Sequence, residues 1–324
     1  VLVMKKSLIA LAVLGASGFA MAQSSVTLYG VADGGIGKAP GGKTGFVSSN
    51  SYTNNGASRV GLKGVEDLGG GLKAGFNFET GLWMGTGNAY GVRTGKDLTG
   101  NDKLVNQFWN RNAMVFLGGS WGQFTMGRYY TPSFSAQTGF WELTGAANYS
   151  VVLNTYLIGG DSVWQDNQFR YDAPNFGGLS GSIAYTTKND NADLATGVTP
   201  GSKWAGAVTY ANGPLSGALT VNKVQGLKTG WNLGGRYNMG NFIVAASYND
   251  ARSVRRGISI GGTAIFGAAS ATLDITRDTK NAAGKRTNFV LEGKYSLSKR
   301  TFAYADYLRV DRRNSYTIGV RHNF

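Results

Sequence analysis

The amino-acid sequence predicts an all-β fold: a transmembrane antiparallel β-barrel of about 16 strands that forms a single domain. Three observations lead to this prediction. Apolar and polar residues alternate with a period of two in many segments. Short turns and long polar links follow one another along the chain. Beyond the N-terminal segment, no apolar stretch approaches the ~20 residues that a membrane helix needs.

The alternation is clearest in four segments, each close to the ~10 residues of a tilted membrane strand. In 72–79, 231–237, 289–296 and 316–324, aliphatic or aromatic side chains take one face and small, polar or charged side chains take the other. A soluble β-sandwich shows the same alternation. The barrel is favoured because aromatic residues stand at strand ends, where an interfacial girdle places them, namely Trp83, Trp204, Trp231, Tyr295 and Phe324.

The connections between these segments alternate in length, which is typical of outer-membrane barrels. Short turns rich in Gly or polar residues are expected near 67–71, 118–122, 175–180, 212–216, 238–241 and 296–299. Longer polar links are expected at 37–56, 86–106, 188–202 and 276–286. The alternation is poor in 251–285, where we expect two strands, Arg255–Phe266 and 269–276, around a turn near Gly267.

The N-terminus resembles a cleavable export signal. A basic start, Met4-Lys5-Lys6, precedes an apolar stretch, 8–19, and then the small-residue pattern Ala20-Met21-Ala22. We expect residues 1–22, with 1–3 as an upstream start, to be a signal peptide cleaved before Gln23, and 23–324 to form the barrel. A membrane anchor is the alternative, but this stretch is short for a bilayer of ~30 Å.

Composition argues against several other classes of protein. The chain has no Cys, and its one His is His322, so thiol chemistry, His-based catalysis and multi-His metal sites are not expected. We predict no enzyme activity, no cofactor and no metal. The formal charge is +14, and the Lys and Arg residues are scattered rather than clustered. Nucleic-acid binding is therefore disfavoured, and a basic channel interior explains the charge equally well.

One long segment lacks cations although the chain is basic. From Tyr129 through Phe169 there is no Lys or Arg, and the acids present are Glu142, Asp161 and Asp166. If this segment folds into the lumen, its acids would face a basic wall and create a field across a narrow aqueous pore. An exposed surface loop with ordinary acids is the alternative.

Six motifs, in order along the chain, resemble those of Gram-negative general porins, in particular the β-proteobacterial group with neisserial and Bordetella/Comamonas-like members. They are QSSVTLYGVAD at 23–33, SRVGLKGVEDLG at 58–69, GR with TP at 127–132, RYDAPNFGG at 170–178, LSKRT at 297–301 and GVRHNF at 319–324. The resemblance covers most of the chain and is weak in 251–285.

The resemblance implies a homotrimer of 16-stranded barrels in the outer membrane, with the third extracellular loop inside the lumen. It implies that wall arginines, here Arg59, Arg128 and Arg170, oppose acids of the loop, for which Glu142 and Asp161 are the candidates. The C-terminal residues, Phe324, His322 and Val320, resemble the signal read by the barrel-assembly machinery. Val31 replaces a Lys that enteric relatives often carry, and the enteric Pro-Glu-Phe-Gly loop signature is absent.

The expected function is passive diffusion of small hydrophilic solutes and ions, with a preference for anions, beside lipid and lipopolysaccharide of the outer membrane. The alternative is a substrate-specific channel for organic anions, phosphate or sugars, because Trp141 and Trp164 could provide an aromatic track. An outer-membrane enzyme is disfavoured because no nucleophile has a base beside it. An adhesin barrel would be smaller or plugged.

Overall fold

A computed structural model describes residues 25–48, 52–89, 92–96, 102–106, 108–187 and 201–324. The expected signal peptide and the 188–200 part of one long link lie outside these residues. Within the described residues, no helix is both long enough and apolar enough to cross a membrane.

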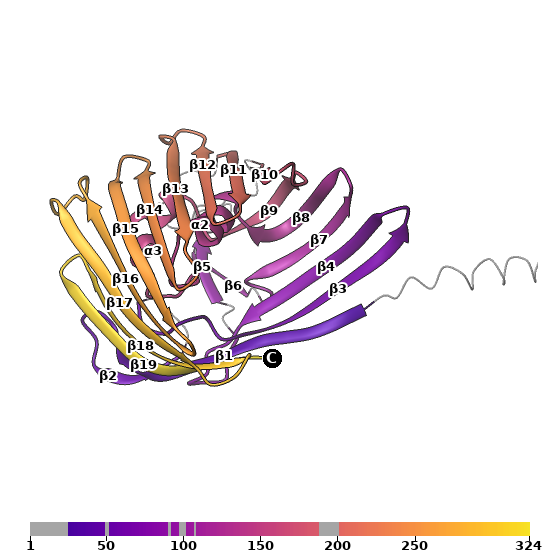
Figure 1. Cartoon of the computed structure of the whole chain (residues 1–324). Helices are drawn as coiled ribbons and strands as arrows, with labels where there is room; N and C mark the ends of the chain where they lie inside the picture. The colour runs from indigo at the N-terminus through magenta and orange to yellow at the C-terminus, as the bar shows by residue number, and fades with distance from the viewer. Residues whose placement is uncertain (1–24, 49–51, 90–91, 97–101, 107, 188–200) are drawn as a thin grey trace, which may run out of the picture.

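The fold is a closed antiparallel β-barrel (Figure 1). The described residues form a main sheet of 17 strands, of which the short β2 (Thr44–Val47) lies in the first loop, so the wall has 16. The wall strands are β1 (Ser25–Lys38), β3 (Arg59–Gly69), β4 (Leu72–Gly81), β7 (Asn112–Gly119), β8 (Gly122–Tyr130), β9 (Trp164–Asp172), β10 (Leu179–Thr186), β11 (Lys203–Asn212), β12 (Leu215–Val224), β13 (Gly230–Asn238), β14 (Phe242–Ala251), β15 (Arg255–Phe266), β16 (Ala269–Asp278), β17 (Arg286–Ser296), β18 (Thr301–Val310) and β19 (Arg313–Asn323). A separate hairpin in the second loop consists of β5 (Val92–Lys96) and β6 (Asp102–Asn106).

The first and last strands close the barrel. β1 pairs with β19, with Val31 opposite Asn323 and Lys38 opposite Tyr316. The first half of β1 pairs with β3. Closure leaves no free sheet edge, which is the condition for a sheet to exist in lipid.

The two faces of the wall differ in polarity. On the outer face large aliphatic side chains are exposed, for example Ile318 at 71%, Ile260 at 62% and Val208 at 54%. On the inner face of the same strands Thr317, Ser259 and Ala207 are buried. An apolar outer band around a polar interior is unfavourable in water and suited to a bilayer.

The turns follow the predicted layout. Gly69, Gly70 and Gly71 turn the chain between β3 and β4 with positive φ angles of 84°, 59° and 80°, a conformation that glycine adopts without a steric penalty. The expectation for 251–285 is confirmed: β15 and β16 pair antiparallel on either side of Gly267. Their alternation is poor in sequence because Gly and Thr occupy several of the paired positions.

The third loop, 131–163, lies inside the barrel (Figure 1). Its helices α2 (Pro132–Phe140) and α3 (Val151–Gly160) contact the inner face of β11 to β18. The Thr131 side chain caps α2 by accepting a hydrogen bond from Phe134 N at 3.2 Å, and Pro132 follows at the first helical position. The main buried apolar cluster forms between this loop and the wall, with Trp141, Tyr149, Val152 and Tyr156 at its centre.

Candidate pore constriction

The loop and the wall enclose a cavity of about 1340 Å³ within the described part of the chain. Its lining comes from the first loop, the second loop, the third loop and the wall strands β3, β8, β9 and β19. Of the five charged side chains that line it, four are arginines and one is an aspartate: Arg59, Arg111, Arg128, Arg321 and Asp161. The described side chains that line this cavity therefore carry more positive than negative charge.

Arg59 and Arg111 share one carboxylate. Arg59 Nε lies 3.3 Å from Glu79 Oε2, and Arg111 Nε donates a hydrogen bond of 2.5 Å to Oε1 of the same side chain. Glu79 belongs to β4 and is buried at 3% exposure. Because one negative charge faces two guanidinium groups, this cluster keeps a net positive charge.

Arg128 is held by two contacts at the wall. Its Nη1 donates to Asp166 Oδ1 at 2.5 Å and its Nε donates to the Asn110 carbonyl at 2.7 Å. The indole of Trp164 lies beside it, with ring centroid 5.9 Å from Arg128 Cζ and 4.6 Å from Arg111 Cζ. These contacts fix the planes of both guanidinium groups against an aromatic surface.

Arg321 reaches the cavity from the last strand. Its Nη1 donates to Asn55 Oδ1 at 2.8 Å and its Nε to Asn323 Oδ1 at 3.1 Å. Both partners are neutral amide oxygens, so these hydrogen bonds orient the guanidinium without neutralising its charge.

Arg170 does not belong to this cluster, contrary to the expectation of three arginines in one constriction. It pairs with Thr125 across β8 and lines a second cavity of about 530 Å³ next to the short turns, together with Lys73 and Asp172. Asp172 Oδ1 accepts from Arg170 Nε at 3.0 Å and from its Nη2 at 2.7 Å. Arg170 Nη1 also donates to the Tyr130 carbonyl at 2.8 Å and to Ser135 Oγ of the third loop at 3.1 Å, so the side chain joins the wall to the base of that loop.

Among the described residues, neither expected loop acid forms an ion pair with the lining arginines. Glu142 is 2% exposed and accepts hydrogen bonds from Thr144 N at 3.0 Å and Ala146 N at 2.6 Å within its own loop. Asp161 lines the cavity, but it forms an ion pair with Lys203 of β11 and accepts from Ser162 N at 2.7 Å. Backbone amides thus stabilise the Glu142 carboxylate, and Lys203 pairs with the Asp161 carboxylate. These are the two carboxylates that were expected to pair with the wall arginines.

Sequence comparisons agree with the barrel. The sequence profile of the Gram-negative porin family matches residues 7–315. The chain belongs to this family. Outer membrane porin protein 32 of Delftia acidovorans is 31% identical, with 98% of this chain and 93% of that protein covered. An outer membrane porin protein of Bordetella pertussis is 29% identical over 99% of this chain and 100% of its own length.

Solved structures agree as well. The anion-selective porin from Comamonas acidovorans superposes with a TM-score of 0.72 at 25% identity, covering 93% of this chain and all of its own. OmpF of Salmonella typhi, at 14% identity, shares the fold with a TM-score of 0.64. The chain is thus an outer-membrane porin, whose relatives are channels.

In this porin the first loop helps to hold the third. Asp33 of β1 accepts hydrogen bonds from Asn54 Nδ2 at 3.0 Å, Gly56 N at 3.1 Å and Tyr304 OH at 2.8 Å. Asn54 Oδ1 then accepts from Asn148 Nδ2 of the third loop at 2.9 Å. The inner part of the first loop is therefore tied to the wall and to the third loop.

Buried Tyr149 of the third loop also contacts both the first loop and the wall. Tyr149 OH accepts a hydrogen bond of 2.6 Å from Asn55 Nδ2 and donates one of 2.5 Å to Glu292 Oε2. Burial raises the pKa of Tyr149 well above its usual range, and the adjacent Glu292 carboxylate raises it further. The phenol therefore stays protonated and can serve as a donor to the wall.

Two lining arginines, Arg111 and Arg321, were not predicted. Arg111 immediately precedes β7, outside any alternating segment. Arg321 lies within the C-terminal motif, where the alternation already placed it on the face opposite Val320 and Phe324. That alternation could have identified Arg321 as a lumen residue, but the C-terminal motif was interpreted only as an assembly signal.

The aromatic expectations are partly wrong. Trp83 lines the cavity instead of joining an outer girdle, because it lies in the second loop just after β4 ends. Trp204, Tyr295 and Phe324 are exposed on the outer face, at 51%, 54% and 46%. Trp141 is 1% exposed behind the loop and does not reach the cavity, whereas Trp164 does.

Proposed function

We propose that this porin is a general diffusion channel, a passive water-filled path for small hydrophilic solutes and ions, and that it favours anions. The observation that carries the preference is the set of four arginines among the five charged side chains around the cavity. In a pore with low-dielectric walls, a net positive charge lowers the energy of an anion and raises that of a cation. The anion-selective Comamonas acidovorans porin shares the fold at 25% identity.

The reversal potential in a planar bilayer under a potassium chloride gradient tests the proposal. A potential of the sign set by chloride supports it, and one of the sign set by potassium contradicts it. The arginines proposed to determine the selectivity are Arg59, Arg111 and Arg321. Arg128 and Arg170 contribute less, because each forms an ion pair with a carboxylate, Asp166 and Asp172 respectively.

We also propose a trimeric assembly and insertion by the barrel-assembly machinery. The terminal residues Val320, His322 and Phe324 lie on the outer face of β19, where His322 Nδ1 and Thr301 Oγ1 are 2.9 Å apart. We propose removal of residues 1–22 on export, which N-terminal sequencing of the purified protein tests. No enzymatic activity is proposed.

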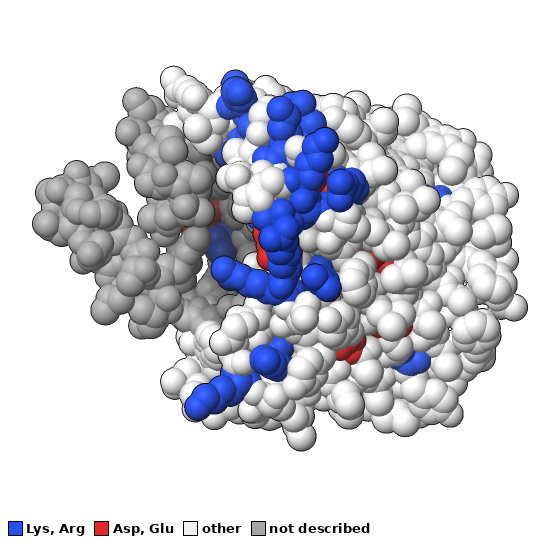
Figure 2. Space-filling view, turned by 90° about the vertical axis from the view of Figure 1, so that its left-hand side faces the viewer, with Lys and Arg blue, Asp and Glu red and all other residues white. Residues whose placement is uncertain are grey.

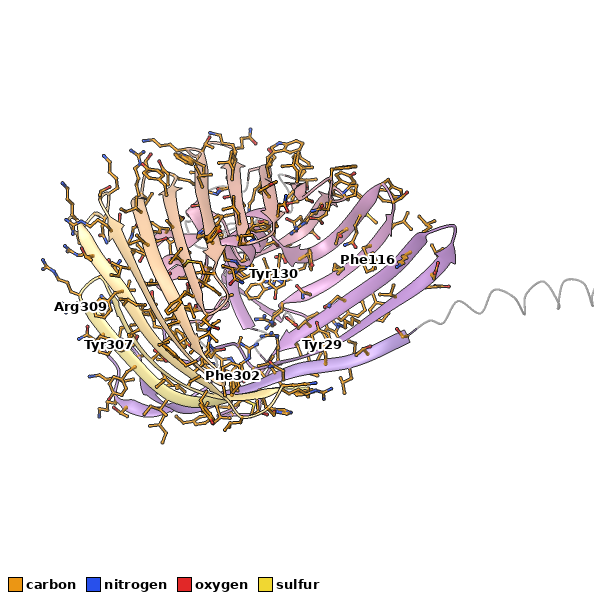
Figure 3. All side chains as sticks on the ribbon, in the orientation of Figure 1. Tyr29, Phe116, Tyr130, Phe302, Tyr307 and Arg309 are labelled. Atoms are coloured by element: carbon orange, nitrogen blue, oxygen red, sulfur yellow. The ribbon has the colours of Figure 1, made fainter. Side chains whose placement is uncertain are left out.

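Phosphate-bearing lipopolysaccharide is the proposed lipid partner. Figure 2 shows Lys and Arg side chains crossing the face that carries the ends of β14 to β19. Exposed members of this stripe are Arg277, Lys280, Lys285, Arg309, Arg312 and Arg313. The nearby Asp278 and Asp311 both form ion pairs with Arg255. In Figure 3 Arg309 and Tyr307 point away from the barrel, where a lipid phosphate would meet them.

A substrate-specific channel for organic anions is the second candidate. One observation favours it over channels for phosphate or sugars: the lining arginines stand next to a stack of aromatic rings. Tyr130 stacks on Phe134 at 5.2 Å and on Trp164 at 5.7 Å between ring centroids. A purely hydrophilic ion path needs no such surface.

A further inference from the structure

The cavity has an apolar side in addition to its arginines. Tyr130 and Trp164 of the wall form a continuous stack with Phe134 of the third loop, and all three rings line the cavity. Figure 3 places Tyr130 in the interior of the barrel. Trp83, 43% exposed, adds a fourth aromatic ring to the same lining.

The third loop presents an aliphatic side chain to the same space. Leu157 lines the cavity and is 50% exposed, which is unusual for a leucine inside an aqueous channel. The backbone that holds it there is strained. Leu157 and Ile158 have φ angles of 49° and 57°, in the left-handed region that leucine and β-branched isoleucine avoid. Strained residues at a cavity point to a function for their position.

The positive charge stands beside these apolar groups. The Arg111 guanidinium lies over the Trp164 ring at 4.6 Å and also donates to Tyr130 OH at 3.3 Å. Arg59 and Arg321 line the same cavity. A molecule that carries a negative charge at one end and a flat apolar body at the other matches both surfaces at once.

We propose that the constriction is a weak binding site for aromatic carboxylates. The carboxylate meets the arginines, and the ring lies against Trp83, the Phe134–Tyr130–Trp164 stack or Leu157. This inference deepens the anion preference proposed above and rests on it. A drug-sized ligand pocket measures roughly 300–1,000 Å³, so the cavity of about 1340 Å³ admits such an anion and leaves room for water beside it. Weak binding is compatible with passage, since a permeant solute must also leave.

The test uses the full-length mature porin in planar bilayers, with benzoate, acetate and phenol added separately to a potassium chloride bath. Benzoate is expected to halve the chloride current at a concentration about two- to tenfold lower than acetate, from the size of one aromatic contact. Phenol, which has the ring without the charge, is expected to have no effect at that concentration. Equal potency of benzoate and acetate overturns the proposal, and so does a phenol effect equal to that of benzoate.

Two variants locate the site. F134L removes the outer ring of the stack, and L157N removes the aliphatic surface while keeping a residue that tolerates a left-handed backbone. Each is expected to bring benzoate toward the potency of acetate. F242L, at a lipid-facing phenylalanine that is 54% exposed, is the matched control. If both lumen variants keep the benzoate potency of the unaltered protein, the proposal is overturned.

The failure of this inference is distinguishable from failure of the proposed function. A cation-preferring reversal potential in potassium chloride alone contradicts the anion preference, before any organic anion is added. An anion-preferring channel that treats benzoate and acetate alike contradicts only the binding site.

Discussion

The guanidinium of Arg111 lies 4.6 Å from the centre of the Trp164 ring, on the wall of the cavity. Arg111 comes from the end of the second loop and Trp164 from the first residue of β9. The contact therefore joins a loop to the wall and gives the cationic group a fixed plane. The anion preference that we propose rests on such fixed charges.

Neutralising Arg321 is expected to reduce anion preference more than neutralising Arg170. In R321Q the cavity loses a charge that amide oxygens orient but do not offset. In R170Q the lost charge was already paired with Asp172. One charge at ~4 Å in water is worth about 1 kcal/mol, so the chloride-to-potassium permeability ratio should fall about two- to fivefold in R321Q. Equal effects of the two substitutions would contradict the assignment.

Anion preference is expected to weaken as salt increases. The lining arginines are in contact with an aqueous cavity, and the Debye length falls from about 10 Å at 0.1 M to about 3 Å at 1 M. Reversal potentials measured at a constant concentration ratio across this range check the expectation. A preference that stays constant at high salt would point to selection by pore size instead of charge.

The barrel could be predicted from sequence because its rules are local. Alternation and turn length identify strands even in 251–285, where β15 and β16 form as expected. The C-terminal alternation also separated the outward Val320 from the inward Arg321. Each of these inferences needs only the near neighbours of a residue along the chain.

The constriction could be predicted only in part because it depends on contacts between distant residues. Arg59 and Arg128 line the same cavity. The partners of Asp161 and Glu142 could not be inferred, since Lys203 lies 42 residues beyond Asp161 and Glu142 is satisfied by amides of its own turn. Arg170 lines the second cavity because it pairs with Thr125, three residues before Arg128 on β8, a position along the barrel that sequence alternation does not give.

Tyr149→Phe is expected to loosen the third loop. The phenol links Asn55 of the first loop to Glu292 of β17, so its removal leaves two buried polar groups without this partner. Each such loss costs about 1–3 kcal/mol. Single-channel records should show more current noise than those of the unaltered protein. Y210F, at an exposed tyrosine, is the control, and an equally quiet Y149F channel would mean that other contacts suffice.

Alkaline pH is expected to destabilise the folded protein through buried tyrosines of the third loop, Tyr149 among them. Burial raises the pKa of both Tyr149 and Tyr156 in the folded protein, whereas an unfolded tyrosine ionises near pH ~10. Above that pH the unfolded chain binds fewer protons than the folded one, so the free energy of unfolding falls as pH rises. Thermal unfolding of the detergent-solubilised barrel followed across this range checks the direction, and Y149F should flatten the decline.

The Asp161–Lys203 pair is expected to anchor the end of the third loop. Both side chains are nearly inaccessible, at 0% and 6%, and Lys203 Nζ also donates to Gln165 Oε1 at 2.9 Å. K203M leaves the Asp161 carboxylate buried without its counter-ion, which costs about 3–5 kcal/mol. The variant should unfold at a lower temperature than the unaltered porin, as measured by the loss of its heat-modifiable folded form.

The double variant D161N/K203M separates the value of the pair from the cost of an isolated charge. With both charges removed, no buried ion remains uncompensated, and most of the lost stability should return. If K203M and the double variant unfold at the same temperature, the loss of stability comes instead from the lost hydrogen bonds of Lys203 to Gln165 and Ser162.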